Sequence, residues 1–91
     1  MIFYKKAKRF NTDTSDLLMD YTNGKVTNDF DYLSIEVYRT PRGVFWILTE
    51  TYNKGSIEIV SKSEAYNLIE SKNEMNEELV QKYFIDLVKD A

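Results

Sequence analysis

The segment from Tyr32 to Tyr52 constrains the fold of this chain more than any other part of it. Two runs of alternating apolar residues flank Thr40-Pro41-Arg42-Gly43, which has the proline and glycine of a tight turn. Alternation with a period of two is typical of half-buried strands. The apolar positions are Leu33, Ile35 and Val37 in the first run and Val44, Trp46 and Leu48 in the second. The pattern predicts a central β-hairpin over residues 32–52.

The residues after this hairpin predict one more strand and then two helices. Asn53-Lys54-Gly55 is a turn, and the β-branched run around Ile57, Ile59 and Val60 predicts a third strand. Ser61 or Ser63 can cap a helix that starts at Glu64, and Asn73 or Asn76 can cap the next. The apolar stripe of the first helix is Ala65, Leu68 and Ile69, and that of the second is Leu79, Val80, Tyr83, Phe84, Leu87 and Val88.

The N-terminal part is less regular. Residues 1–10 resemble a strand with one wet face, and Asn11-Thr12-Asp13-Thr14 is a turn. Residues 14–21 are either a short helix or the return strand of a first hairpin, and the period-two spacing of Leu17, Met19 and Tyr21 favours the strand. Asn23-Gly24 predicts a further turn, followed by a surface loop to Asp31.

Together these elements predict an α+β fold. The 91 residues are too few for two cores, so we expect a single domain over residues 1–91. Its core is an antiparallel sheet of four or five strands, with the two C-terminal helices packed on one face.

The amino-acid composition limits the catalytic and metal-binding groups that the chain can supply. The chain has no cysteine and no histidine, which excludes disulfides, thiolate zinc sites and the side chain most used as a general base near neutral pH. We therefore predict a protein that is not an enzyme and needs no cofactor or metal. The N-terminus has no hydrophobic signal region, so we expect a soluble, unsecreted protein of the cytoplasm.

Charge alternates in sign along the chain, although its sum is only −3. Residues 1–9 carry +4, residues 10–36 carry −5, residues 37–62 carry +2 and residues 63–91 carry −4. Nucleic-acid-binding proteins are usually net basic, because neutralisation of phosphates supplies most of their binding energy. Direct binding to nucleic acid would therefore need a local basic patch.

Several side-chain sets could form such a patch or another binding surface. The basic residues Lys5, Lys6, Lys8 and Arg9 alternate with the aromatic residues Phe3, Tyr4 and Phe10, and could hold phosphates and stack bases, or simply protect an edge strand. Arg39 and Arg42 flank the hairpin turn and are expected to project as a small basic prong. Trp46 is expected in the core, whereas the tyrosines near strand ends, Tyr32, Tyr38 and Tyr52, are candidate interface anchors.

The carboxylates have two interpretations. Asp13, Asp16, Asp20, Asp29 and Asp31 match no calcium loop, and we expect them to form a solvated edge rather than a magnesium site. The C-terminal acids are expected on the wet side of the helices, where they could also imitate nucleic-acid phosphates. These are Glu64, Glu70, Glu74, Glu77, Glu78, Asp86 and Asp90.

Three segments resemble a group of small accessory proteins carried by phages and mobile elements of Gram-positive bacteria. They are Lys8 to Thr14, Asp29 to Tyr32, and Val37 to Trp46, and a weaker similarity follows from Ile59 to Ala65. A glycine-rich stretch of that group is replaced here by Glu50-Thr51-Tyr52-Asn53-Lys54. Some proteins of this kind resemble anti-CRISPR proteins, so the resemblance implies a non-enzymatic inhibitor of host defence that binds a Cas nuclease of a type II system.

The sequence thus gives two principal functional hypotheses and a minor one. The first is that inhibitor, with predicted partner-binding residues Arg39, Arg42, Tyr38, Tyr52, Asp29, Asp31, Glu74, Glu77 and Glu78. The second is a small nucleic-acid-binding accessory or regulatory protein that uses the basic patch of residues 5–9. The minor one is a metal nuclease that relies on carboxylates.

Overall fold

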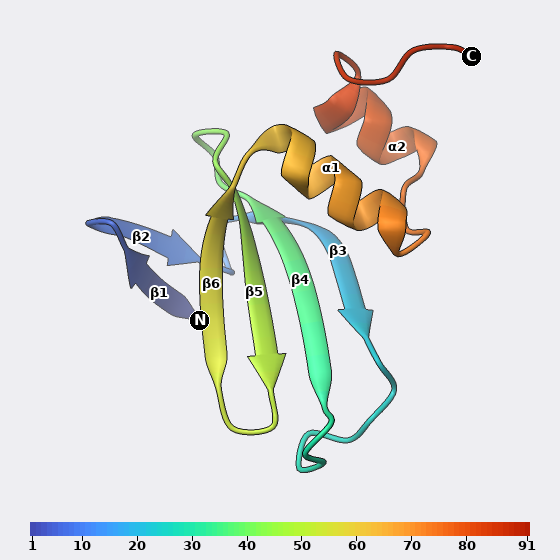
Figure 1. The fold of residues 1–91 in the computed structure, drawn as a ribbon. Helices are drawn as coiled ribbons and strands as arrows, with labels where there is room; N and C mark the ends of the chain where they lie inside the picture. Colours follow the sequence, from blue (N-terminus) through green and yellow to red (C-terminus); the bar gives the residue numbers. More distant parts are fainter.

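The computed structural model describes all residues from Met1 to Ala91 and shows an α+β fold (Figure 1). A two-stranded sheet joins β1 and β2, and a four-stranded sheet has the order β3-β4-β5-β6. The strands are β1 (Ile2–Lys5), β2 (Lys8–Asn11), β3 (Asp16–Thr22), β4 (Leu33–Arg39), β5 (Phe45–Thr51) and β6 (Gly55–Val60). The helices are α1 (Lys62–Ser71), α2 (Glu77–Leu79) and the π-helical turn η1 (Val80–Phe84) that continues it.

The central hairpin is confirmed. β4 and β5 pair in antiparallel fashion, with Tyr38 opposite Trp46, and the chain turns between them at Thr40–Gly43. Gly43 has a φ of 88°, a left-handed conformation that glycine adopts without steric cost. The Thr40 hydroxyl accepts a hydrogen bond from the Val44 N–H at 3.1 Å, which closes the turn. β6 continues the predicted meander, and residues 16–22 form a strand rather than a helix.

The pairing predicted for the N-terminal part is wrong. Residues 16–22 do not return along an N-terminal strand but pair with β4, while residues 2–11 fold on themselves as the β1–β2 hairpin. The chain reverses at Lys6 and Ala7, whose φ values of 52° and 61° are left-handed. Lysine and alanine rarely adopt this conformation, and asparagine or glycine usually marks such a turn, so the sequence carries no signal for it.

One face of the four-stranded sheet is covered by the helical segment. Ser61 caps α1 by accepting a hydrogen bond from the Glu64 N–H, and the Glu64 carboxylate accepts one from the Ser61 N–H in return, a capping box. Ala65 and Ile69 of α1 are fully buried against this face. The core here comprises Leu18, Met19, Val37, Phe45, Val60, Ala65, Ile69 and Phe84.

The second predicted helix is shorter than its apolar stripe suggested. Asn76 caps α2 as expected, but the helical segment ends at Phe84. Phe84 stacks on Phe45, the first residue of β5, with ring centroids 5.7 Å apart. The following residues therefore lie beyond the end of the sheet (Figure 1), and Leu87 and Val88 stay partly exposed. No helix here has both the length and the apolar character needed to span a bilayer.

The opposite face of the sheet is covered by the β1–β2 hairpin. Phe10 packs on the fully buried Trp46 at a centroid distance of 5.5 Å, and Phe3 lies at 6.3 Å from it. Tyr38 stacks on the same indole at 4.6 Å. The core on this side comprises Phe10, Tyr38, Trp46, Leu48 and Ile57. At this end of the molecule the four-stranded sheet is therefore the middle layer, between the helical segment on one face and the β1–β2 hairpin on the other.

We expect Phe84→Ala to lower the free energy of unfolding by about 3–5 kcal/mol, because it removes a fully buried ring that contacts both the sheet and α1. Urea denaturation measures this loss. Ile85→Ala is the matched control, since Ile85 is 55% exposed, and should change stability by less than about 0.5 kcal/mol. Equal effects of the two variants would contradict the docking of the C-terminal segment.

Candidate anion-binding groove

The acidic residues predicted to bind a partner do not form one surface. Asp29 and Asp31 lie in the β3–β4 loop, whereas Glu74 in the α1–α2 connection and Glu77 and Glu78 of α2 lie toward the other end of the sheet (Figure 1). Glu78 pairs with Lys82 at 3.2 Å, and Glu77 accepts a hydrogen bond from Gln81 at 2.9 Å. The acids of the β3–β4 loop and those near α2 therefore belong to two separate surfaces.

The expected basic prong is not formed, because Arg39 and Arg42 diverge. Arg39 belongs to β4 and lies on the helix-covered face, with its guanidinium carbon 5.5 Å from the centroid of the Tyr83 ring. This cation–π contact tethers the C-terminal segment to the sheet. Arg42 is exposed in the turn and reaches toward the other side of the sheet.

Tyr38 is not an exposed anchor either. It is only 6% exposed, because its ring is enclosed by Trp46 on the hairpin-covered face. Its hydroxyl donates a hydrogen bond to Glu36 Oε1 at 3.2 Å. Burial, together with the negative charge of Glu36, raises the pKa of Tyr38 to about 12. Tyr38 therefore packs in the core, and its hydroxyl group donates a hydrogen bond to the carboxylate of Glu36.

Tyr52 is exposed as expected and is joined by a residue that the sequence reasoning missed. The rings of Tyr52 and Phe30 lie 4.5 Å apart, and Phe30 is 81% exposed. Phe30 stands between Asp29 and Asp31 in the loop. These four residues form an acidic-aromatic tip at the end of the molecule remote from the hairpin turn of β4 and β5.

Three carboxylates share the hairpin-covered face of the sheet, beside the core on that side. Asp20 is directly opposite Glu36 in the sheet, and Glu50 follows Leu48, the other cross-strand neighbour of Glu36. Burial raises the pKa of Glu36, and the charges of Asp20 and Glu50 raise it further, against the lowering effect of the hydrogen bond from Tyr38. No group of three or more acidic side chains in the structure is arranged to hold a metal ion.

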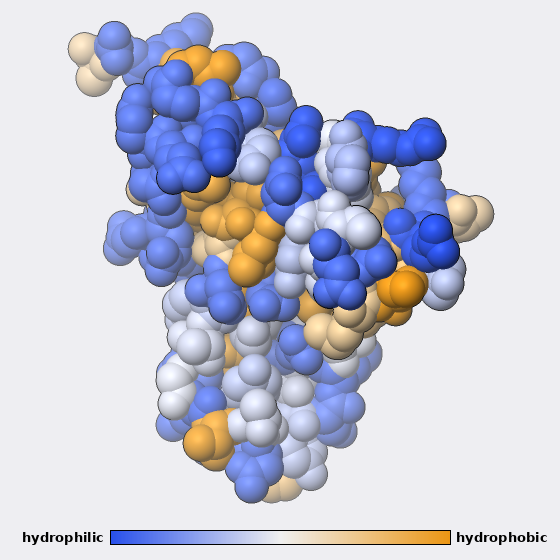
Figure 2. Space-filling model, turned by 180° about the vertical axis from the view of Figure 1, so that it is seen from behind, coloured by the Kyte–Doolittle hydropathy of each residue, from blue (hydrophilic) through white to orange (hydrophobic).

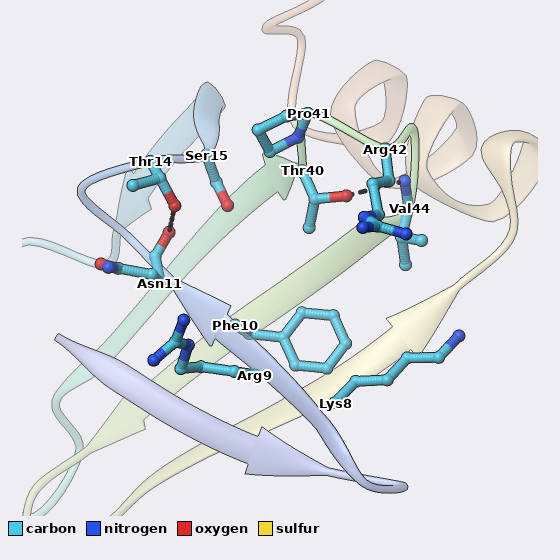
Figure 3. Close-up of a pocket in the computed structure, with 10 residues that line it drawn as sticks. All are labelled: Lys8, Arg9, Phe10, Asn11, Thr14, Ser15, Thr40, Pro41, Arg42 and Val44. Atoms are coloured by element: carbon cyan, nitrogen blue, oxygen red, sulfur yellow. Dashed lines mark hydrogen bonds between the residues drawn. The ribbon is translucent and has the colours of Figure 1, made fainter.

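The largest hollow on the molecule is a groove of about 420 Å³ between the N-terminal hairpin and the β4–β5 turn (Figure 3). One wall is β2 with the loop that follows it, and the other is the β4–β5 turn from Thr40 to Val44. The lining residues are Lys8, Arg9, Phe10, Asn11, Thr14, Ser15, Thr40, Pro41, Arg42 and Val44. Figure 3 shows β2 lying between β1 and the groove, so that its unpaired edge faces the hollow.

The lining of this groove suits an anion. Lys8, Arg9 and Arg42 supply three positive charges, and no carboxylate is among the lining residues. Arginine forms paired hydrogen bonds with phosphate or carboxylate oxygens. Additional polar groups come from Asn11, Thr14, Ser15 and Thr40. We therefore identify this groove as the candidate functional site.

Local contacts fix both walls of the groove. The Trp46 indole donates a hydrogen bond to the Ser15 hydroxyl at 3.3 Å, which ties the β2–β3 loop to β5. The Asn11 side chain accepts one from the Asp13 N–H at 2.9 Å, which shapes the turn. On the hairpin, Lys5 donates to the Ile57 carbonyl of β6 at 2.8 Å. The groove is thus built into the packing of the hairpin on the sheet.

The space-filling view in Figure 2 shows the molecule from behind. Hydrophilic residues cover most of the helical end, the hairpin side carries both hydrophilic and apolar residues, and apolar atoms gather in the recess between them. A smaller apolar spot lies at the lower end of this view. Val26 and Phe30 of the β3–β4 loop are 66% and 81% exposed. The exposed apolar surface is thus divided into separate patches.

No protein-family model, curated protein or solved structure matches this chain.

We expect Glu36→Gln to raise the melting temperature at pH 7. The amide can still accept the hydrogen bond from Tyr38, while the burial of charge and its repulsion from Asp20 and Glu50 are removed. Because the pKa of Glu36 is raised in the folded state, this gain should be complete above that pKa and vanish below the ordinary carboxyl value of 4.5.

Thermal melts followed by circular dichroism between pH 3 and 8 measure this difference. Glu58→Gln is the control, since Glu58 is an exposed strand residue on the other face of the sheet. A gain for Glu36→Gln that is the same at every pH would contradict the assignment of the effect to ionisation.

Proposed function

We propose that this protein is a small nucleic-acid-binding accessory protein, and that the groove between the β1–β2 hairpin and the β4–β5 turn holds the phosphate backbone of its ligand. The observation that carries the proposal is that Lys8, Arg9 and Arg42 all line one hollow, together with amide and hydroxyl groups and no acid. A phosphate backbone is the common biological ligand that offers several anionic groups in a row.

The arrangement of charge supports local rather than general binding. The net charge of −3 would repel a nucleic acid from most of the surface. The carboxylates of Asp20, Glu36 and Glu50 lie on the same face of the sheet as the hairpin but not among the residues that line the groove. A ligand strand is therefore directed to the hairpin end of the molecule. Binding should weaken steeply as salt is added, because phosphate contacts release counterions.

The groove has binding groups but no obvious catalytic set. Its cationic side chains can hold phosphate oxygens, and its hydroxyl and amide groups can donate hydrogen bonds to the sugar-phosphate chain. Neither a carboxylate nor an imidazole lies among its lining residues to activate water. The proposed role is therefore to hold or cover a strand without turnover.

Fluorescence anisotropy with a labelled oligonucleotide tests this proposal. The double variant Arg9→Glu with Arg42→Glu should weaken binding by at least about ten-fold and reduce the salt slope by about two, one for each lost phosphate contact. The matched control is Lys25→Glu with Lys54→Glu, which makes the same charge change in the β3–β4 loop and the β5–β6 turn. Equal weakening by both variants, with folding intact by circular dichroism, would refute a specific groove.

A second candidate function is inhibition of a type II Cas nuclease. The acidic-aromatic tip favours it, because Phe30 and Tyr52 offer exposed rings flanked by the carboxylates of Asp29 and Asp31. Such a surface suits a basic channel of a protein partner, where an aromatic side chain anchors and the acids provide charge complementarity. Inhibition would then be stoichiometric.

A cleavage assay with a purified type II Cas nuclease, guide and target tests this second function. We expect inhibition at equimolar protein and its loss in Phe30→Ala with Tyr52→Ala, since the exposed rings would supply the anchor. Ile85→Ala, which removes an exposed apolar side chain at the helical end of the molecule, is the control. Nuclease activity that is unaffected by an excess of the unaltered protein would argue against inhibition of that nuclease.

A further inference from the structure

Resting on the proposed binding of nucleic acid, we infer that the groove takes a single strand and that Tyr4 stacks on one of its bases. Tyr4 is directly opposite Arg9 in the β1–β2 ladder, so the two side chains share the outer face of the hairpin. Arg9 also lines the groove. A nucleotide whose phosphate contacts Arg9 would therefore place its base beside the Tyr4 ring.

The ring of Tyr4 is available for this contact. Tyr4 is 74% exposed, whereas Phe3 and Phe10 point to the inner face of the hairpin and pack against Trp46. Tyr4 belongs to none of the aromatic pairs of the molecule. Ile2, which is 50% exposed, lies on the same outer face and extends the apolar platform. Aromatic side chains beside a basic groove are the common means of holding single strands.

A double helix fits this surface poorly. Its bases are stacked on one another, so their faces cannot reach Tyr4. A wide duplex laid over the groove would also overlie the sheet face below the hairpin, where Asp20, Glu36 and Glu50 would repel its phosphates. A single strand is narrow enough to follow the groove and leave those carboxylates uncovered. The exposed Tyr4 ring and the carboxylates near the hairpin therefore both favour a single strand over a duplex.

Anisotropy titrations with four probes test this inference. The probes are oligothymidylate, an abasic strand of equal length, the duplex of oligothymidylate with oligoadenylate, and oligouridylate. The unaltered protein should bind oligothymidylate about ten-fold more tightly than the abasic strand, which is within the range for one stacked base. The duplex should bind more weakly than oligothymidylate. Comparison with oligouridylate distinguishes DNA from RNA as the source of the strand.

Variants of Tyr4 assign the preference to its ring. Tyr4→Ala should abolish the preference for oligothymidylate over the abasic strand, and Tyr4→Phe should retain it, because stacking needs the ring and not the hydroxyl. Tyr52→Ala, at the far end of the sheet, should leave the preference unchanged. Because Tyr4 is exposed, none of these changes removes a core contact.

The two proposals fail in different ways. If no probe binds, or if all bind without dependence on Arg9 and Arg42, the nucleic-acid groove itself is refuted. If the probes bind through those arginines but the abasic strand and the duplex bind as tightly as oligothymidylate, the groove stands and the stacking of a base on Tyr4 is refuted.

Discussion

The burial of large apolar side chains on both faces of one hairpin is the constraint on which the rest of the structure depends. Val37 and Phe45 point to one face of the β4–β5 pair, and Tyr38 and Trp46 point to the other. Each such side chain contributes about 1.5–3 kcal/mol when it is removed from water. Neither face of this end of the sheet can therefore remain wet, so the helical segment must cover one and the β1–β2 hairpin must cover the other.

Much of this fold could be predicted from the sequence, because the decisive signals are local. The proline and glycine at Thr40–Gly43 mark the central turn, and Ser61, three residues before Glu64, marks the start of the first helix. The β1–β2 turn could not be predicted, since Lys6 and Ala7 adopt left-handed conformations that their residue types do not favour. Because this turn was not predicted, the expected pairing of β1, β2 and β3 was wrong.

The candidate site was harder to predict, because it joins residues about thirty positions apart. Arg9 and Arg42 were recognised as separate basic elements, and only the docking of the hairpin on Trp46 brings them to one groove. The charge along the chain gives no sign that these two arginines line the same groove. The separation of Arg39 from Arg42 did have a sequence signal, because Arg39 follows Val37 at a spacing of two and so shares its face of the strand. Tyr38, one residue before it, is buried on the other face for the same reason.

The position of the single tryptophan gives the molecule an internal optical probe. The indole of Trp46 touches Phe10 and donates its hydrogen bond to Ser15, and both of these residues line the groove. Any displacement of the hairpin or of the loop after β2 therefore changes the polarity and hydrogen bonding around the chromophore. Intrinsic emission can thus report a movement of these parts of the groove in the unlabelled protein, with no second indole to complicate the spectrum.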